Sequence, residues 1–379
     1  MNSSTAVGDG LAAETRLRLV RSKLNGWVAV LAGLVVLLGT TAQVASADGV
    51  AAGTSPTVVR NTSTGEQTVF YVNSKQEIAY WYNSRTLGWI NSVLGGSVAA
   101  NSSPTAVINN AGNIYLYYVS GAHQITNFTY TASSGVWTGP TVFGGKVESG
   151  TSPTAVINLS AGYQYVYYVD VGGEIFNYTW SGLWLGPTAI GGKVAAGTGI
   201  ADVLDQSNGY QYLYFVNTSY EIANFTASTR WIGPTTFGGK VAPGSSPAAV
   251  MWPSNHYQYV YFVDAAEEIA NFTWAGSWVG PTTIGGAVES GTSPTVVLYP
   301  TNGYQYLFYV NPSFQIVNFT ASTAWVGPTV FGGKVLSGTS PASMINPSNS
   351  YLYAYYVNNG VGSIGNFTWA GSWQGPTIL

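Results

Sequence analysis

Tryptophan is the residue type with the clearest binding chemistry in this chain, because it recurs at one fixed interval. The face of an indole ring packs on the apolar C–H face of a sugar ring, while neighbouring hydroxyls and amides hydrogen-bond to the sugar's polar rim. The alternative is that one large aromatic residue per repeat only fills a core. The row has seven members, 47 or 48 residues apart: Trp89, Trp137, Trp184, Trp231, Trp278, Trp325 and Trp373.

A second, incomplete set of tryptophans lies four residues before this row. It occupies the third, fifth and seventh repeats as Trp180, Trp274 and Trp369, whereas the fourth and sixth repeats have Ala227 and Ala321. A core position must be filled in every repeat. The irregular occupancy therefore favours surface variation and ligand contact, and we take all ten tryptophans as candidate ligand-binding residues.

Acidic residues and histidines do not suggest catalysis. A glycosidase needs two carboxylates near one another, and the only close pairs are Asp202 with Asp205 and Glu267 with Glu268. The chain has two histidines and no cysteine, which argues against a histidine-based metal site or triad and rules out thiol chemistry and disulfides. We expect no enzyme activity, no catalytic residue, no metal site and no cofactor.

A row of asparagines has the Asn-x-Thr pattern of an N-glycosylation site. We favour a structural role, in which the Asn and Thr side chains satisfy polar groups at strand edges. A sugar contact by the amide is the minority alternative. The row consists of Asn127, Asn177, Asn224, Asn271, Asn318 and Asn366.

The first 47 residues differ in kind from the repeats. Four basic residues precede an apolar run, Trp27–Leu38, and residues 45–47 read Ala-Ser-Ala, the small-x-small pattern of a signal-peptidase site. The run is shorter than the roughly 20 apolar residues that a membrane span needs. We predict a signal peptide over residues 1–47 and a secreted, extracellular chain over residues 48–379 that does not insert into membranes.

Composition restricts the partners of this secreted chain. The full sequence has 12 basic and 15 acidic residues, and residues 1–47 contain four and two of them, which leaves a net charge of −5. This charge argues against nucleic acid and anionic membrane surfaces as partners. Only 7% of residues are charged and 14% are aromatic. Such a surface is suited to neutral glycans or glycoconjugates.

The repeat also predicts the elements that position the tryptophans. In residues 151–193, turn signals separate four strand-length stretches, at 154–158, 163–170, 174–180 and 184–190. The second stretch has aromatic or β-branched residues on both faces, so its sheet should be covered on both sides. Seven four-stranded antiparallel units of about 47 residues predict an all-β, seven-bladed β-propeller over residues 48–379. Whether the strand at 373–379 belongs to the first or the seventh blade stays open.

Two more rows share the period of the tryptophans. A Gly-Gly pair follows each of the first six tryptophans, as in Gly144-Gly145. A Ser-Pro pair begins every repeat except the fourth, where Gly199-Ile200 replaces it. The prolines are Pro56, Pro104, Pro153, Pro247, Pro294 and Pro341.

With these three rows, the unit resembles the blades of the seven-bladed propeller lectins, the group that includes bacterial lectins from Photorhabdus and the fungal lectin of Psathyrella velutina. The resemblance covers residues 48–379. It implies a carbohydrate-binding protein with several sugar pockets between adjacent blades, whose weak sites add up to avidity. The chain departs from that group where Asn-Phe-Thr, as at residues 224–226, replaces a tryptophan-rich strand, and it lacks an arginine in the second strand. The alternative is a structural or protein-interaction propeller without a sugar site.

Overall fold

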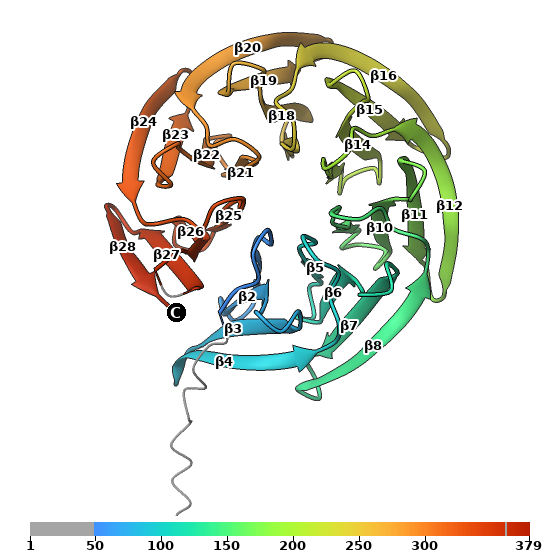
Figure 1. Cartoon of the computed structure of the whole chain (residues 1–379), viewed down its shortest axis with the longest axis vertical. Coiled ribbons are helices and arrows are strands. Elements are labelled where there is room, and N and C mark those ends of the chain that lie inside the picture. Colours follow the sequence, from blue (N-terminus) through green and yellow to red (C-terminus); the bar gives the residue numbers. More distant parts are fainter. Residues whose placement is uncertain (1–48, 361) are drawn as a thin grey trace, which may run out of the picture. The chain divides into compact units, whose positions relative to one another are not determined.

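The computed structural model describes residues 49–360 and 362–379, and the predicted signal peptide lies outside these residues. The described residues form seven four-stranded antiparallel sheets, in which the strands follow one another in chain order. The sheets are arranged as a ring of blades (Figure 1). The predicted seven-bladed β-propeller is therefore confirmed. Within residues 49–360 and 362–379, no helix is long and apolar enough to cross a membrane.

Each blade contains four consecutive strands. The first blade comprises β1 (Thr57–Arg60), β2 (Gln67–Val72), β3 (Ile78–Ser84) and β4 (Gly88–Gly95), and the second comprises β5 (Thr105–Ile108), β6 (Ile114–Val119), β7 (Ile125–Thr131) and β8 (Val136–Gly144). The third blade comprises β9 (Thr154–Ile157), β10 (Gln164–Val169), β11 (Glu174–Trp180) and β12 (Trp184–Lys193). The fourth comprises β13 (Ile200–Leu204), β14 (Gln211–Val216), β15 (Glu221–Ala227) and β16 (Trp231–Lys240). The last three comprise β17 (Ala248–Trp252), β18 (Tyr257–Val263), β19 (Glu268–Trp274) and β20 (Trp278–Ala287); β21 (Thr295–Leu298), β22 (Gln305–Val310), β23 (Ile316–Ala321) and β24 (Trp325–Gly332); and β25 (Ala342–Asn346), β26 (Tyr351–Asn358), β27 (Ser363–Trp369) and β28 (Trp373–Ile378).

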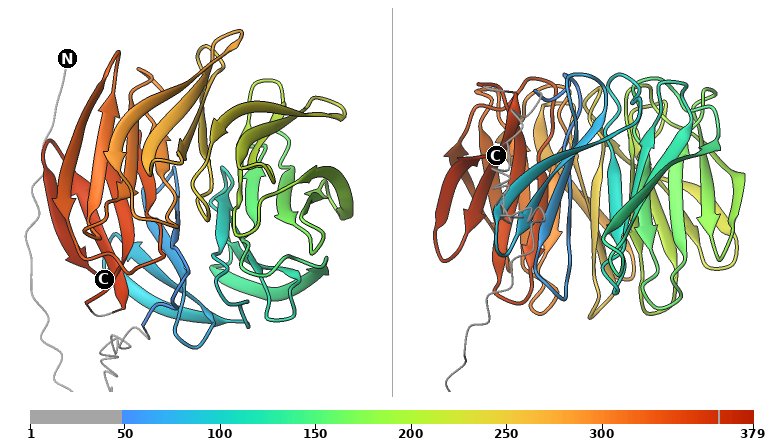
Figure 2. Two further views of the ribbon diagram at one scale, coloured as in Figure 1. Left: turned by 45° about the horizontal axis from the view of Figure 1, so that its top comes forward. Right: turned by 90° about the horizontal axis from the view of Figure 1, so that it is seen from below.

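The first strand of each blade lies at the centre of the ring and the fourth strand at its rim (Figures 1 and 2). First strands of neighbouring blades contact one another in sequence, from β1 and β5 through to β25 and β1. The second strands are almost completely buried, as expected for a strand with apolar residues on both faces. Each blade thus depends on both neighbours for its core.

The ring closes without sharing a strand between its first and last blades. Strand β28 pairs with β27, where Trp373 lies opposite Trp369, so the seventh blade is built entirely from the C-terminal end of the chain. The first blade is built entirely from β1 to β4. Side-chain packing, including an edge-to-face contact between Trp89 and Tyr355 with ring centroids 6.2 Å apart, and hydrogen bonds, including one from the Val50 N–H to the Gly362 carbonyl, therefore hold this junction.

A circuit of serine hydrogen bonds runs around the ring at the Ser-Pro positions. The backbone N–H of one serine donates to the hydroxyl of the serine in the next blade, at 2.8–2.9 Å, and the bond from Ser340 to Ser55 joins the last blade to the first. In the fourth blade Gly199 donates to Ser246 but has no hydroxyl to offer Ser152. The repeated serine thus bridges neighbouring blades, and the fourth blade lacks the accepting hydroxyl of this bridge.

A second circuit joins the second strands across five of the seven blade junctions. A fully buried tyrosine hydroxyl donates to the side-chain oxygen of a glutamine in the next blade. At the other two junctions both partners are apolar, Phe70 with Ile114 and Phe308 with Leu352. These two junctions therefore lack both the tyrosine donor and the glutamine acceptor, and neither is left unpaired. The five bonded pairs are Tyr117–Gln164, Tyr167–Gln211, Tyr214–Gln258, Tyr261–Gln305 and Tyr355–Gln67.

The Gly-Gly row lets successive blades approach closely. The second glycine of each pair has a positive φ, and a Cβ there would collide with an aromatic ring of the following blade. At Gly239, for example, a Cβ would lie 2.9 Å from Phe262. Only glycine combines this conformation with this spacing.

Completing the serine circuit should stabilise the ring. We expect Gly199→Ser to raise the midpoint of thermal unfolding by the equivalent of about 0.5–1.5 kcal/mol, because its hydroxyl would accept from the Ser152 N–H. A Cβ at this position would lie 3.1 Å from Ser246 Oγ, which requires only a small adjustment. Gly199→Ala is the control, since it adds the Cβ without the hydroxyl. Equal melting of the two variants would contradict the bridging role.

The paired loss of donor and acceptor predicts strong coupling at the junction of the sixth and seventh blades. Phe308→Tyr or Leu352→Gln alone buries an unpaired polar group, which costs about 1–3 kcal/mol. The double variant should regain most of that stability by forming the bond seen at five other junctions. A double-mutant cycle in denaturant measures the coupling. Simple addition of the two losses would show that the pair does not interact.

Candidate functional site

The tryptophan row lies in the gaps between blades. Each tryptophan begins, or nearly begins, the outer strand of its blade and stands edge-to-face on a second-strand aromatic ring of the preceding blade. Centroid distances are 5.7–6.2 Å and interplanar angles 77–88°. All seven are only partly buried. Each indole therefore belongs to an interblade core and still presents part of its surface to solvent.

The second set of tryptophans packs against this row. Trp180, Trp274 and Trp369 lie directly opposite the row tryptophan of their own blade, with centroids 5.6–5.7 Å apart. In the same gaps the row tryptophan packs against a phenylalanine of the preceding blade, with centroids 4.1–4.3 Å apart and the ring planes tilted by 36–38°. These phenylalanines are Phe143, Phe237 and Phe331.

The gaps that have alanine instead of the second tryptophan also have a smaller partner. Ala227 and Ala321 are buried, and the preceding blades present Ile190 and Ile284 where the three gaps with a second tryptophan have phenylalanine. In these five gaps, tryptophan at the second position thus occurs with phenylalanine from the preceding blade, and alanine occurs with the smaller isoleucine. Irregular occupancy of this position reflects matched packing across the gap and not surface variation alone.

The asparagine row is buried and its amides are occupied by neighbouring groups. Four of the six amides donate to the Thr two residues later at 3.0–3.2 Å, and the other two, Asn318 and Asn366, donate to backbone carbonyls and accept from that Thr. The side chains are 4–7% exposed, which leaves little room for a glycan or for sugar contact in the folded ring. The favoured structural role agrees with these contacts.

The gap between the first and second blades contains two adjoining cavities, of about 210 and 290 Å³. Four aromatic rings line them, from Tyr80, Tyr82, Tyr130 and Trp137. Tyr80 and Tyr130 contact Trp137 with centroids 5.8 and 5.3 Å apart. Thr68, Tyr82, Ile114 and Tyr130 line both cavities, so the two lie next to each other.

A change of bulk between two strands opens this gap. In the other six blades a second-strand tyrosine pairs with a third-strand threonine, as Tyr165 does with Thr179, whereas the first blade has Thr68 opposite Tyr82. Tyr80 also replaces the buried asparagine found at this place in the other blades. The aromatic ring has thus moved from the second strand to the third, which leaves space beside Thr68.

Polar groups surround the second cavity. Asn61, Ser63, Thr64 and Glu66 contribute an amide, two hydroxyls and a carboxylate to its lining. Burial alone would raise the pKa of Glu66, but hydrogen bonds from Thr64 and Tyr82 outweigh it and lower the pKa, so the carboxylate is ionised at neutral pH. Burial and this carboxylate together raise the pKa of the Tyr82 hydroxyl. The site therefore combines apolar ring faces with hydrogen-bond acceptors and donors.

Sequence reasoning identified Trp137 in this site but missed Thr68, Tyr80, Tyr82 and Glu66. Their signal is departure from the repeat, since all four positions differ in the first blade from the residues that most other blades carry. The structure does not bring the ten tryptophans into one site; it distributes them over the seven gaps.

The two acidic pairs lie in different parts of the ring. Asp202 and Asp205 lie at the centre of the ring, in the wall of its central cavity. Asp205 is paired with His256, at 2.8 Å between Oδ2 and Nδ1. Glu267 lies in a hairpin turn with a φ of 59°. Among the described residues, no group of three or more histidine, cysteine or acidic side chains could hold a metal ion.

Comparison with known proteins shows a shared fold and does not assign this chain to a family. No protein-family model matches the sequence. No curated protein matches it either. Among solved structures, the BP39L lectin from Burkholderia pseudomallei superposes with a TM-score of 0.77 at 16% identity, covering 88% of this chain and 99% of that one.

Two further lectins match with lower scores. The SapL1 lectin, solved with alpha methyl fucoside, has a TM-score of 0.56 at 22% identity over 73% of this chain and 95% of its own. The Aleuria aurantia lectin, described as a six-bladed β-propeller with a novel fucose recognition mode, has a TM-score of 0.57 at 22% identity over 75% and 98%. Identities this low show a shared fold, that of β-propellers described as lectins; the narrower Photorhabdus and Psathyrella group stays a prediction.

Proposed function

We propose that this chain is a secreted, multivalent carbohydrate-binding protein, with sugar pockets between its blades and no catalytic activity. The observation that carries the proposal is the cavity between the first and second blades, where four aromatic rings adjoin an ionised carboxylate, an amide and hydroxyls. Ring faces cover the C–H face of a sugar, and the polar groups bond its hydroxyls. Neutral glycans or glycoconjugates are the proposed partners.

Three further observations support this assignment. Solved propellers with the same fold are described as lectins, two of them in terms of fucose. Every blade gap has a partly exposed tryptophan, so one ring offers repeated surfaces for sugar stacking. Several weak sites on one rigid scaffold give avidity without any single tight pocket. The secreted location follows from the predicted signal peptide at residues 1–47.

The proposed site can be closed with residues that the chain itself uses elsewhere. The double variant Thr68→Tyr/Tyr82→Thr restores the pairing of the other six blades and returns an aromatic ring to the space beside the second strand. We expect it to lose at least about tenfold in affinity for the glycan at this gap, a change of about 1.4 kcal/mol, and to fold normally. A glycan array on residues 48–379 selects the ligand, and calorimetry measures its binding.

Thr68→Ser is the control, because it keeps the cavity open and should bind like the native chain. If the double variant binds the glycan with unchanged affinity, the glycan binds at another gap and not between the first and second blades. If no glycan on a broad array is bound, the carbohydrate proposal itself fails and the protein-interaction alternative stands.

The second set of tryptophans tests multivalency. Replacing Trp180, Trp274 and Trp369 by Ala should reduce the number of sugars bound per chain, because loss of a stacking contact removes roughly 0.5–1.5 kcal/mol from a weak site. The substitution should also lower the midpoint of thermal unfolding, because these rings pack on the row tryptophans. The gaps that naturally have Ala differ in this respect, since they contain no phenylalanine for a second tryptophan to support. Replacement by Phe, which keeps an aromatic ring, is the matched control. An unchanged calorimetric stoichiometry in the Ala variant would assign these residues to packing alone.

A further inference from the structure

The first blade presents a row of mostly polar side chains to the seventh blade, at the junction where the ring closes (Figure 1). The row consists of Arg60, Gln67, Asn83 and Trp89, which lie directly opposite one another on its four strands. Its direction is fixed by Tyr355 of the seventh blade, since Gln67 accepts a hydrogen bond from this tyrosine and Trp89 packs against its ring. All four side chains therefore face the gap between the seventh and first blades.

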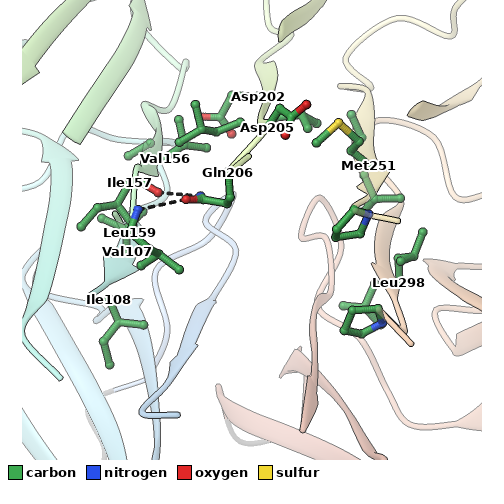
Figure 3. Close-up of a pocket in the computed structure, with 18 of the residues that line it drawn as sticks. Val107, Ile108, Val156, Ile157, Leu159, Asp202, Asp205, Gln206, Met251 and Leu298 are labelled. Atoms are coloured by element: carbon green, nitrogen blue, oxygen red, sulfur yellow. Dashed lines mark hydrogen bonds between the residues drawn. The ribbon is translucent and has the colours of Figure 1, made fainter. Parts of the chain in front are cut away.

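Arg60 has no charged counterpart in the rest of the ring. The other six blades have isoleucine, leucine or methionine at this position, and these residues line the central cavity of about 870 Å³ (Figure 3). Arg60 does not line that cavity. Burial raises the pKa of Tyr353 in the seventh blade, and the Arg60 charge acts against that rise, so the guanidinium lies close to the seventh blade. The fold does not require an arginine here, because the equivalent residues are Ile108, Ile157, Leu204, Met251, Leu298 and Ile345.

No acidic side chain neutralises Arg60. It forms no ion pair among the residues that the structure describes. The opposite wall cannot supply one, because residues 335–379 contain no aspartate, glutamate, lysine or arginine. The two acids of the first blade are engaged elsewhere, Glu66 in the lining of the gap to the second blade and Glu77 with the Asn73 amide at 3.1 Å. Arg60 is thus a largely covered charge without a counter-ion, which is an unfavourable arrangement.

One edge of the guanidinium remains open to solvent. Arg60 is 9% exposed, and its one hydrogen bond within residues 49–360 and 362–379 runs from Nη1 to the Asn61 carbonyl at 3.5 Å. Nε and Nη2 have no partner there, yet neither nitrogen is completely covered by protein. The N–H groups of this edge are parallel donors, the arrangement that bonds both oxygens of a carboxylate.

A second guanidinium lies close to the first. An atom placed as a Cβ on Gly65 would lie 3.7 Å from Arg60 Nη1 and 3.8 Å from Arg85 Nη2. Arg85 is exposed, and its charge already acts on Glu66, whose pKa it helps to lower. Two guanidinium groups thus share the charge of one carboxylate. Like charges this close repel each other, and an anion bound beside them offsets the repulsion.

Neutral polar groups and one indole complete the gap. Asn83 stands where the other blades have tyrosine, tryptophan or alanine. On the seventh blade Gln374 is exposed where the other blades have leucine, isoleucine, valine or threonine. Amides bond sugar hydroxyls, and the partly exposed Trp89 offers a ring face to a sugar. Three independent departures from the repeat, at Arg60, Asn83 and Gln374, therefore make this gap hydrophilic.

We propose that the gap between the seventh and first blades binds an acidic oligosaccharide, with the carboxylate of a uronic acid against Arg60 and a neighbouring sugar against Trp89. Adjacent strands lie about 4.8 Å apart, so the row from Arg60 to Trp89 spans about 14 Å, which suits an oligosaccharide better than a single sugar. The inference rests on the proposed carbohydrate function and adds a charged class of ligand, at a gap other than the one between the first and second blades.

Calorimetric titration of residues 48–379 with oligogalacturonate, oligomannuronate and oligoglucuronate tests the proposal. The control ligands are the same oligosaccharides after reduction of their carboxyl groups to primary alcohols, which removes the charge and keeps the sugar backbone. We expect at least one uronate to bind at least about tenfold more tightly than its reduced counterpart. Its affinity should fall severalfold between about 20 and about 500 mM NaCl, because salt screens the ion pair, while binding of the reduced form should hardly change.

Arg60→Met places at this position the residue type of the fifth blade, so the ring should fold, and its midpoint of thermal unfolding should not fall. We expect this variant to lose at least about tenfold in uronate affinity, to bind the uronate and its reduced counterpart equally, and to lose the salt dependence. Arg60→Lys keeps the charge without the paired donors and should give a smaller loss. Arg230→Met is the matched control, because it removes an exposed arginine of the fourth blade and the same charge from the chain; it should bind the uronate like the native chain.

Four results would overturn the proposal: no binding of any uronate, equal binding of uronate and reduced oligosaccharide, unchanged uronate binding by Arg60→Met, or an equal loss in Arg230→Met. Tighter binding of a sulfated oligosaccharide than of every uronate would overturn the assignment of a carboxylate. The Thr68→Tyr/Tyr82→Thr variant should bind the uronate normally, which separates this gap from the one between the first and second blades. If neutral glycans bind and no uronate does, this inference alone fails; if no saccharide of either kind binds, the proposed function fails with it.

Discussion

The whole structure depends on contact between successive blades, because no blade buries both of its faces by itself. The second strand of each blade is covered only when the ring is complete. Polar groups placed in these gaps leave water and must find a partner across the junction. The tyrosine–glutamine pairs and the serine circuit are the two solutions that recur, and the apolar pairs Phe70–Ile114 and Phe308–Leu352 avoid the need.

The proposed sugar site between the first and second blades lies where this regular packing is relaxed. At the first gap an apolar pair replaces tyrosine and glutamine, and the aromatic bulk moves to Tyr80 and Tyr82. At the inner edge of the fourth blade Gly199 interrupts the serine circuit, and Asp202 stands where other blades have alanine, valine or serine. A repeat keeps its stability through uniform contacts, so departures from uniformity can serve binding at limited cost to the ring.

Much of the fold could be predicted from periodicity alone, but the junctions could not. The tryptophan, Gly-Gly and Ser-Pro rows gave the number of blades, and turn signals placed the four strands of the third blade within about three residues of their observed ends. Closure of the ring depends on contacts between residues almost 290 positions apart, such as Tyr355 and Gln67, which no local pattern reports. The cavity between the first and second blades was not predicted, because the exchange of tyrosine and threonine at Thr68 and Tyr82 can be recognised only once the pairing of their strands is known.

The junction pairs also restrict how the repeats can be rearranged in evolution. Each blade has a forward-facing side chain on its second strand, tyrosine or phenylalanine, and a backward-facing one, glutamine, isoleucine or leucine, and the two must match between neighbours. Duplication of the third, fourth or fifth blade preserves every match, because these blades are tyrosine forward and glutamine backward. The first and sixth blades cannot be copied next to themselves without setting phenylalanine against glutamine. Lineages of this ring would therefore gain and lose blades mainly from its middle.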